Sequence, residues 1–149
     1  MNEPGAPGGE VAAGLVFRDG RLLIARRPPQ AHLGGLWEFP GGKREAGETF
    51  QQCLRRELAE ELGIEVRVVD LIESLTHEYP GLLVHLRFFR CCWLRHEPRA
   101  VSGQDVAWVT AGDLANYQFP AADSRLLERL RANWREWADC RERPPASSP

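Results

Sequence analysis

A chain of 149 residues with a formal net charge of −2 has the size expected of one soluble domain with a proper core. Hydrophobic residues make up 43% of it and charged residues 27%, and its basic residues are interspersed with acidic ones, which argues against a nucleic-acid polymer as partner. No apolar run approaches the roughly 18 residues that a membrane span needs, so a membrane partner is not expected either.

The two ends of the chain differ in composition from its middle. Residues 1–9 and 141–149 are rich in Pro, Gly and Ser, which predicts disorder. Residues 10–140 show no internal repeat and are predicted to form one domain.

The first predicted elements lie before residue 43. The dipeptide Asp19-Gly20 separates apolar runs at 11–17 and 21–26, a pattern typical of a β-hairpin. A short extended piece is expected at 37–39. It is followed by Pro40-Gly41-Gly42, three consecutive breakers that predict a turn.

The rest of the domain alternates helical and extended patterns. A helix is predicted from 48 to 62, ended by Gly63 as its C-cap. The elements expected after it are strands at 64–75, 82–94 and 106–109, a brief helix at 111–115 and a final helix at 122–138. This order is typical of the α/β class, with a mixed sheet and not a doubly wound parallel one.

The four cysteines are Cys53, Cys91, Cys92 and Cys140. No pair has Cys-x-x-Cys spacing, so the sequence indicates neither a zinc site nor a disulfide framework. The first ten residues lack the basic and apolar regions of a signal peptide. Together these features predict a cytoplasmic protein with reduced thiols.

The strongest chemical signal is a cluster of acidic residues within the first predicted helix. At helical spacing Glu57, Glu60 and Glu61 project from one face, with Glu61 inside the apolar stripe and Glu57 at its border. Partly desolvated carboxylates beside one another need a counter-charge or must take up protons. Oxygen ligands without His or Cys suit Mg²⁺, or Mn²⁺ in its place. The alternative, a solvated acidic face, is disfavoured by the position of Glu61.

The spacing around this helix resembles the Nudix box at every defined position of that motif. The matching residues are Gly42, Glu48, Arg56, Glu57, Leu58, Glu60, Glu61, Gly63 and Ile64. The run from Gly35 to Lys43 is similar to the MutT-type branch of the Nudix family. The resemblance extends over about 11–130 and implies a Nudix-type α/β/α sandwich with a loop-helix-loop that holds metal ions.

The resemblance also implies roles for individual residues. Glu57, Glu60 and Glu61 would be the carboxylate ligands of Mg²⁺, with Glu48 and the carbonyl oxygen of Gly41 as further members. Arg56 would pair with the glutamates and orient them. The implied reaction is attack of water on the β-phosphorus of a nucleoside triphosphate, which releases the monophosphate and pyrophosphate.

One departure from the branch concerns the general base. Members of the branch can carry a glutamate immediately before the late tryptophan, where this chain has Ala107 before Trp108. Asp105 lies two residues earlier, on the same side if the strand extends that far. We therefore expect Asp105 or a glutamate of the box to take that role.

Substrate contacts follow from the same resemblance. Arg27 and Lys43 are candidates for phosphate binding, although a plain surface role is about as consistent with a single basic residue. His32 is a weaker candidate for a nucleotide contact. Phe39 and Tyr79 are expected to form walls of a nucleobase pocket, with the segment from Phe119 to Asp123 reading the edge of the base. Asp123 also stands where it would serve as the N-cap of the last helix.

Several substrates and functions remain open on the sequence. The pattern for oxidised guanine has Asn where this chain has Asp123, and Leu82 replaces an expected arginine. A carboxylate accepts hydrogen bonds, either from the N7–H of 8-oxoguanine or from the amine of cytosine. Pro40 and Phe119-Pro120 favour 8-oxo-dGTP and sanitation of the nucleotide pool. CTP or a modified (d)CTP is a close alternative.

Other functional classes are less favoured. Another Nudix diphosphate hydrolase is possible on the motif, whereas a non-catalytic nucleotide-binding module has no use for the intact glutamate set. The expected partner is a small-molecule nucleotide, and the expected assembly is a monomer or a homodimer.

Overall fold

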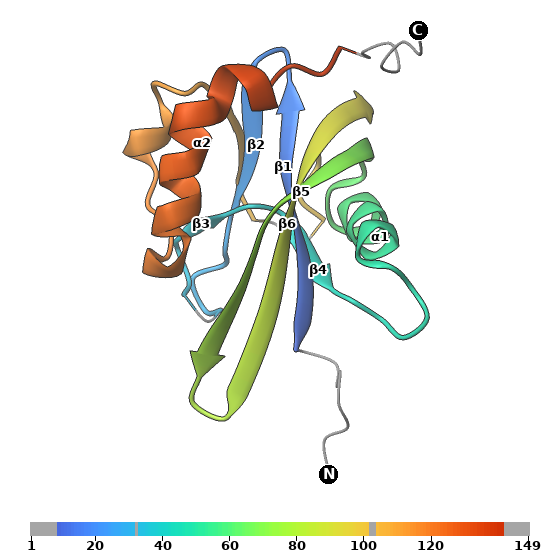
Figure 1. Cartoon of the computed structure of the whole chain (residues 1–149), viewed down its shortest axis with the longest axis vertical. Helices are drawn as coiled ribbons and strands as arrows, with labels where there is room; N and C mark the ends of the chain where they lie inside the picture. Colours follow the sequence, from blue (N-terminus) through green and yellow to red (C-terminus); the bar gives the residue numbers. More distant parts are fainter. Residues whose placement is uncertain (1–8, 32, 102–103, 142–149) are drawn as a thin grey trace, which may run out of the picture.

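The computed structural model describes residues 9–31, 33–101 and 104–141, and in it a mixed β-sheet carries one helix on each face (Figure 1). The elements are β1 (Glu10–Arg18), β2 (Arg21–Arg26), β3 (Trp37–Glu38), β4 (Gly41–Lys43), α1 (Phe50–Leu62), β5 (Glu65–Tyr79), β6 (Leu82–Arg95), β7 (Val106–Val109) and α2 (Ser124–Trp137), with 3-10 turns η1 (Leu114–Asn116) and η2 (Ala121–Asp123).

The sheet has the strand order β3-β2-β1-β6-β5, with β4 paired to β1 and β7 paired to β2. Strands β1 and β2 form the predicted hairpin around Asp19-Gly20. Strand β1 runs parallel to β6, and the other pairs are antiparallel, so the sheet is mixed. The α/β class and the Nudix-type sandwich are thereby confirmed. The long hairpin of β5 and β6 projects below the rest of the sheet (Figure 1).

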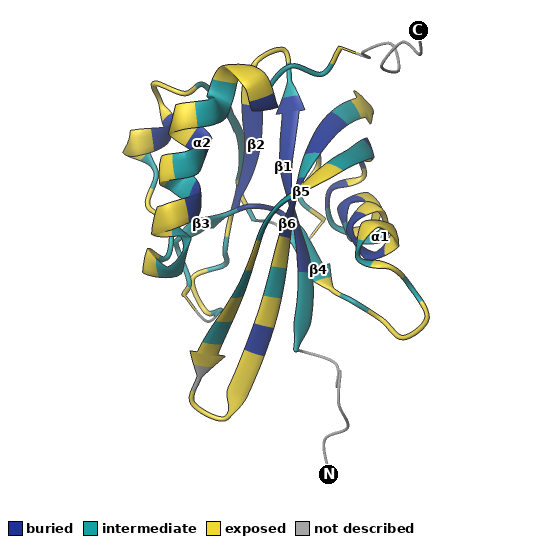
Figure 2. Cartoon of the chain, in the orientation of Figure 1, coloured by how far each residue is buried: buried dark blue, intermediate teal, exposed yellow. Residues whose placement is uncertain are grey.

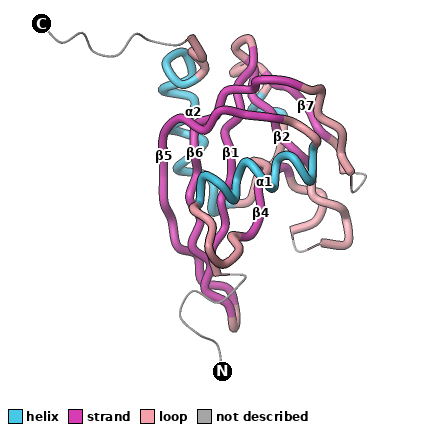
Figure 3. The backbone as a smooth tube through the Cα atoms, turned by 90° about the vertical axis from the view of Figure 1, so that its right-hand side faces the viewer, coloured by secondary structure: helices cyan, strands magenta, loops and turns pink. Residues whose placement is uncertain are grey.

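Two hydrophobic cores lie on opposite faces of the sheet. On β1, Leu15 and Phe17 point into the core under α2, while Val16 points into the core under α1. Because both faces of β1 are covered, its middle is continuously apolar and buried (Figure 2). Figure 3 shows α1 lying across the front of the sheet. No helix among the described residues is long and apolar enough to cross a membrane.

Helix α1 begins two residues later than the sequence predicted. Thr49 is its N-cap and forms a capping box with Gln52, in which each side chain accepts from the other's backbone N–H. Glu48 therefore precedes the helix. Gly63 ends it as predicted, in the left-handed conformation with φ of 69° that favours glycine.

The predicted turn at Pro40-Gly41-Gly42 is wrong. Gly41 and Gly42 belong to β4, which pairs with β1 opposite Ala13 and Ala12. A Cβ atom at Gly41 would lie 1.9 Å from the carbonyl oxygen of Ala12, so the missing side chain is what allows the two strands to approach. Here glycine serves close packing and not a reversal of the chain.

Other boundaries differ by a few residues. Strand β5 continues to Tyr79, four residues beyond its expected end, because it pairs with β6 along the projecting hairpin. The brief helix is a single 3-10 turn, Leu114–Asn116, and the last helix follows a second such turn at Ala121–Asp123.

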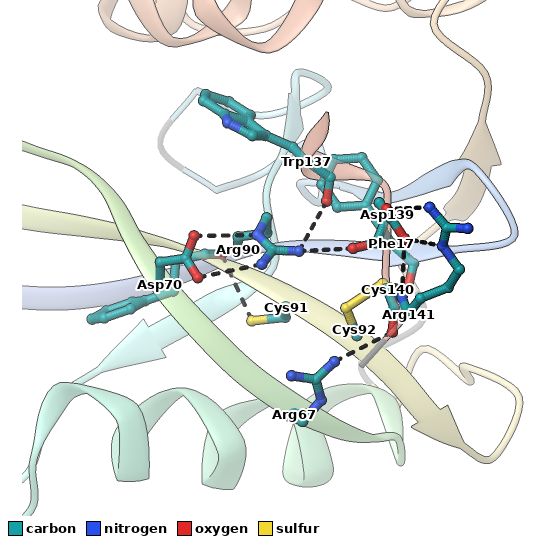
Figure 4. Close-up of a disulfide and its surroundings, with 11 residues drawn as sticks. Phe17, Arg67, Asp70, Arg90, Cys91, Cys92, Trp137, Asp139, Cys140 and Arg141 are labelled. Carbon is teal, nitrogen blue, oxygen red and sulfur yellow. Dashed lines mark hydrogen bonds and ion pairs between the residues drawn. A yellow bond between two sulfur atoms is a disulfide. The ribbon is translucent and has the colours of Figure 1, made fainter. Parts of the chain in front are cut away.

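The expectation of four reduced thiols is also wrong. Cys92 in β6 and Cys140 after α2 form a disulfide with a Cα–Cα distance of 5.7 Å (Figure 4). The two residues are 48 positions apart, and only the docking of the chain end against the sheet brings them together. Cys53 and Cys91 are free and buried.

Candidate active site

Arg56 is the centre of the acidic cluster that α1 presents. Its Nη2 donates to Glu48 Oε1 at 2.7 Å, and its Nε donates to Glu48 Oε2 at 3.0 Å, a bidentate pair. Its Nη1 donates to Glu57 at 3.0 Å and to Glu60 at 3.2 Å, and Nη2 also donates to the carbonyl of Lys43. One guanidinium thus joins the loop before α1, the helix and the end of β4, as the predicted orienting role requires.

The carboxylates of the cluster differ in environment. Hydrogen bonds from Arg56 lower the pKa of Glu48 to about 2. By contrast, burial raises the pKa of Glu57, with Arg56 opposing the shift and the charges of Glu60 and Glu61 adding to it. The side chain of Glu57 is 15% exposed and that of Glu60 is 58% exposed. Glu57 therefore carries a negative charge that its surroundings only partly compensate.

The chemistry of this cluster fits a hard divalent cation. Its donors are carboxylate oxygens, and the raised pKa of Glu57 shows that a positive charge would be favourable there. Within the described part of the chain, no three acidic, His or Cys side chains are arranged around one point. Arg56 instead engages Glu48, Glu57 and Glu60, which gives these carboxylates a counter-charge.

Gly42 faces the carboxyl group of Glu57 directly. A Cβ atom at Gly42 would lie 2.2 Å from Glu57 Cδ and from its Oε2. No neighbouring backbone atom is involved, so a side chain here would displace the carboxylate and leave the strand in place.

We expect Gly42→Ala to reduce kcat/KM about a hundredfold, because a displacement of the Glu57 carboxylate by 1 Å or more disrupts the site. The matched control is Gly112→Ala, since a Cβ atom at Gly112 would meet no neighbour closer than 4.0 Å. Steady-state kinetics and the Tm of both variants are the measurements. Full activity of Gly42→Ala at an unchanged Tm would show that the position of Glu57 does not matter.

A pocket of about 370 Å³ lies beside the cluster. Strand β4 connects the two, since Gly41, Gly42 and Lys43 line the pocket while Gly42 abuts Glu57. The apolar wall consists of Val11, Ala13, Leu33, Phe39, Leu75, Leu82, Val84, Leu86, Phe88, Pro120 and Ala122. The polar groups are the side chains of Arg27, Glu38, Lys43, His77 and Asp123. A mostly apolar hollow with a few polar groups is the usual form of a small-molecule site.

Phe39 is placed as predicted, as a wall of this pocket. Its ring is 5% exposed and stacks on Phe119, with ring centroids 5.1 Å apart and planes at 29°. Phe119 lies behind Phe39 and is not among the residues that line the pocket. It therefore supports the wall and does not form its surface.

Asp123 lies in the pocket and ends η2 immediately before α2. Its side chain makes no capping hydrogen bond to the helix, although it occupies the N-cap position. Burial raises its pKa to about 6, and the charges of Glu38 and Glu73 raise it further. This carboxyl group is therefore available to a ligand and titrates near neutrality.

Glu38 was not singled out by the sequence, although it lies inside the run that resembles the MutT branch. Arg27 Nη1 donates to Glu38 Oε1 at 2.9 Å, and both side chains line the pocket. Burial raises the pKa of Glu38, Arg27 opposes that shift, and the charge of Glu61 adds to it. Glu38 thus stands electrostatically between the acidic cluster and Asp123.

The hairpin of β5 and β6 supplies a further part of the pocket that sequence reasoning missed. Leu75 and His77 of β5 and Leu82, Val84 and Leu86 of β6 line it. The alternation along both strands was the available signal, because it places these side chains on one face. His77 had been expected to be a surface or structural residue.

Asp105 is not brought to the acidic cluster. It precedes β7, its side chain is 68% exposed, and it pairs with Arg26 at 3.6 Å beside a separate surface hollow. Ala107 lies in β7 opposite Ile24 and packs against the core under α2. His32 and the side chain of Tyr79 lie outside the described residues.

Comparison with known proteins gives a consistent result. The family model of the NUDIX domain matches residues 12–129. The CTP pyrophosphohydrolase of Escherichia coli K12 is 39% identical over 123 residues, which cover 83% of this chain and 91% of that protein. The 8-oxo-dGTP diphosphatase of Haemophilus influenzae is 37% identical, over 81% of this chain and 90% of its own length.

A solved structure of MutT, from Aliivibrio salmonicida or Vibrio cholerae, has the same fold. It superimposes with a TM-score of 0.63 at 33% identity and covers 83% of this chain and 97% of its own. The similarity therefore extends through the whole sandwich and beyond the helix that carries the glutamates.

Proposed function

The chain belongs to the NUDIX domain family of hydrolases, and from that premise we propose that it hydrolyses nucleoside triphosphates, chiefly 8-oxo-dGTP, to the monophosphate and pyrophosphate. One observation carries the proposal: β4 places an aromatic-walled pocket directly beside the acidic cluster, with Gly42 in contact with both. A base bound against Phe39 would then have its phosphates near Glu57. The corresponding role is removal of oxidised nucleotides from the pool in the cytoplasm.

We propose Mg²⁺ as the cofactor, with Mn²⁺ able to replace it. Glu57, Glu60 and Glu61 would hold it, helped by Glu48 and the carbonyl oxygen of Gly41. Such an ion, when bound, neutralises phosphate charge and lowers the pKa of a water ligand. Arg56 holds the carboxylates in position before the substrate arrives, which reduces the reorganisation that the reaction needs.

The remaining side chains divide between the two ends of the substrate. Lys43 and Arg27 line the pocket on the side of β4 and β2 and supply positive charge for the phosphates. Arg27 must then exchange part of its pairing with Glu38 for the substrate. For the proton of the attacking water, a glutamate of the cluster is favoured over Asp105, because Asp105 is exposed and paired with Arg26.

CTP or a modified (d)CTP is the second candidate substrate. Two features of the pocket favour it. Asp123 presents a carboxylate able to accept from the exocyclic amine of cytosine, and Leu82, an apolar residue, lines the wall where the guanine pattern has an arginine. A monomer or homodimer acting on a free nucleotide is proposed in either case.

The proposed function is tested by pyrophosphate release from 8-oxo-dGTP, dGTP, CTP and 5-methyl-dCTP, with and without Mg²⁺. We expect metal-dependent release and the highest kcat/KM with 8-oxo-dGTP. A preference above tenfold for a cytidine nucleotide would reverse the order of the two candidates. Absence of release from every triphosphate, with ADP-ribose cleaved instead, would assign the chain to another Nudix reaction.

Asp123→Asn should change substrate preference. An amide both donates and accepts, so it can contact the O6 and the N7–H of 8-oxoguanine, whereas the carboxylate of Asp123 only accepts above its pKa of about 6. We expect the ratio of kcat/KM for 8-oxo-dGTP over CTP to rise about tenfold, the effect of one hydrogen bond of about 1.4 kcal/mol. An unchanged ratio at pH 8 would remove Asp123 from base recognition.

The same variant has a stability signature that does not depend on substrate. Because the folded-state pKa of Asp123 is raised, its contribution to stability is present below about pH 4 and is lost as the pH rises through about 6. Asp123→Asn should therefore raise the Tm at pH 8 by about 4 °C and leave it unchanged at pH 4. Thermal unfolding at both pH values separates this effect from the change in specificity.

A further inference from the structure

The Cys92–Cys140 disulfide encloses the part of the chain that forms one wall of the pocket. The loop it closes spans 48 residues and contains β7, η1, η2 and α2. Within this loop, Pro120, Ala122 and Asp123 line the pocket. A bond at the end of the loop therefore restricts the same segment that contributes Asp123.

Helix α2 connects the disulfide to the pocket. Its 14 residues span about 21 Å, from Ser124, next to Asp123, to Trp137, three residues before Cys140. Leu126, Leu130 and Trp137 bury one side of the helix against the sheet. Motion at the end near Cys140 is thus carried along a packed, rigid element to the end near the pocket.

Non-covalent contacts hold the same end of α2 independently of the bond (Figure 4). Arg90 Nη1 donates to the carbonyl oxygens of Trp137 at 3.3 Å and Asp139 at 3.2 Å, and Arg67 donates to the carbonyl of Cys140 at 3.3 Å. The indole of Trp134 donates to the carbonyl of Gly20 at 2.9 Å. The end of the helix therefore has enough partners to remain docked when the disulfide is open.

The two sulfur atoms differ in access to solvent. Cys92 is 2% exposed, within β6, whereas Cys140 is partly exposed in the segment after α2. A reagent from solution reaches Cys140 first, and Cys92 is then the partner already within bonding distance. An accessible thiol beside a second, resolving thiol is the usual arrangement of a redox-sensitive pair.

We propose that Cys92 and Cys140 form a reversible redox clamp that fixes α2, and with it the Asp123 wall of the pocket, under oxidising conditions. The thiolate of Cys140 attacks a peroxide, giving a sulfenic acid and releasing water or an alcohol. The Cys92 thiol then displaces the hydroxyl as water. In sum, two thiols and one hydrogen peroxide give one disulfide and two waters, and a dithiol reductant reverses the bond by thiol–disulfide exchange.

The clamp acts in the direction that the proposed function would need. A bond that closes a long loop disfavours the unfolded chain, so the oxidised protein is the more stable one. The enzyme would then be most robust under the conditions that generate oxidised nucleotides. The clamp itself rests on the geometry alone, and its test does not require hydrolysis.

The test compares the full chain treated with hydrogen peroxide with the same chain treated with dithiothreitol. Thiols counted after denaturation should number two in the first and four in the second. The Tm of the oxidised form should be about 10 °C higher, as expected for a loop of this length. Hydrogen exchange should quicken at residues 119–126 on reduction and stay unchanged in α1, which serves as the internal control.

Cys140→Ser is the matched variant, because it removes the partly exposed sulfur and leaves β6 intact. Its Tm should equal that of the reduced wild type and should not respond to either reagent. Four thiols after peroxide treatment, or equal Tm values for the two forms, would overturn the clamp. A bond that dithiothreitol opens only in denaturant would also overturn it, in favour of a permanent structural disulfide. Activity that follows the redox state while nucleotide preference fails would affect the proposed function alone.

Discussion

Glu57→Gln should lower kcat about a thousandfold, a rise of about 4 kcal/mol in the barrier, with little change in KM. Glu57 is the member of the cluster whose charge is least compensated: burial raises its pKa, and Glu60 and Glu61 raise it further. Glutamine keeps the size and the contact with Gly42 but removes the negative charge that would hold a cation. The loss therefore appears in the chemical step.

The fold should tolerate this change. A carboxylate with a raised pKa opposes folding when ionised, so its neutral counterpart is not expected to lower the Tm at pH 7 to 8. Glu128→Gln is the matched control, since it removes an exposed carboxylate from α2 and should retain full activity. The decisive measurements are pyrophosphate release at saturating substrate and a Mg²⁺ titration of the Tm, in which only wild type and the control should respond. Wild-type turnover by Glu57→Gln would remove the central element of the proposed function.

Arg56→Ala is expected to lower kcat/KM about a hundredfold to a thousandfold and, unlike Glu57→Gln, to lower the Tm by about 5 °C at pH 7. The variant leaves Glu48 and Glu57 without their shared guanidinium and frees the loop before α1 from the end of β4. Arg56→Lys keeps the charge but not the forked geometry, so it should recover stability more than activity.

The pH dependence of this loss follows from Glu48. Arg56 lowers the pKa of Glu48 to about 2, so the stability gained from the pair is present above about pH 4.5 and is lost as the pH falls toward 2. The difference in Tm between wild type and Arg56→Ala should be full at pH 6 to 8 and should shrink below pH 4.5. Arg55→Ala, an exposed neighbour on the same helix, is the matched control and should show neither effect. A pH-independent difference would mean that Arg56 acts by packing and not by pairing.

Local spacing explains why the acidic cluster could be predicted from the sequence. The helical period alone places Glu57, Glu60 and Glu61 on one side of α1, and the structure agrees that Glu57 and Glu61 border the buried stripe of Cys53, Leu54, Leu58 and Leu62. The C-cap at Gly63 and the hairpin at Asp19-Gly20 were equally local and were confirmed. The roles of these residues in catalysis stay predictions until the variants are measured.

Contacts between distant segments could not be read in the same way. Gly41 and Gly42 were interpreted as turn residues, because their chemistry is the same whether they reverse the chain or allow two strands to approach; the pairing of β4 with β1 decided between the two. The capping box at Thr49 competed with Glu48 for the start of the helix and placed Glu48 in the loop, within reach of Arg56.

The sequence by itself determined the family, the α/β class and the acidic helix, since these depend on residue type at short, regular spacing. Only the tertiary structure decided that Glu38 and Arg27 pair inside the pocket, that Asp123 is buried enough for its pKa to reach about 6, and that Cys92 meets Cys140. The physical reason is that burial and long-range pairing depend on what the rest of the chain places around a residue, and a one-dimensional pattern does not contain that information.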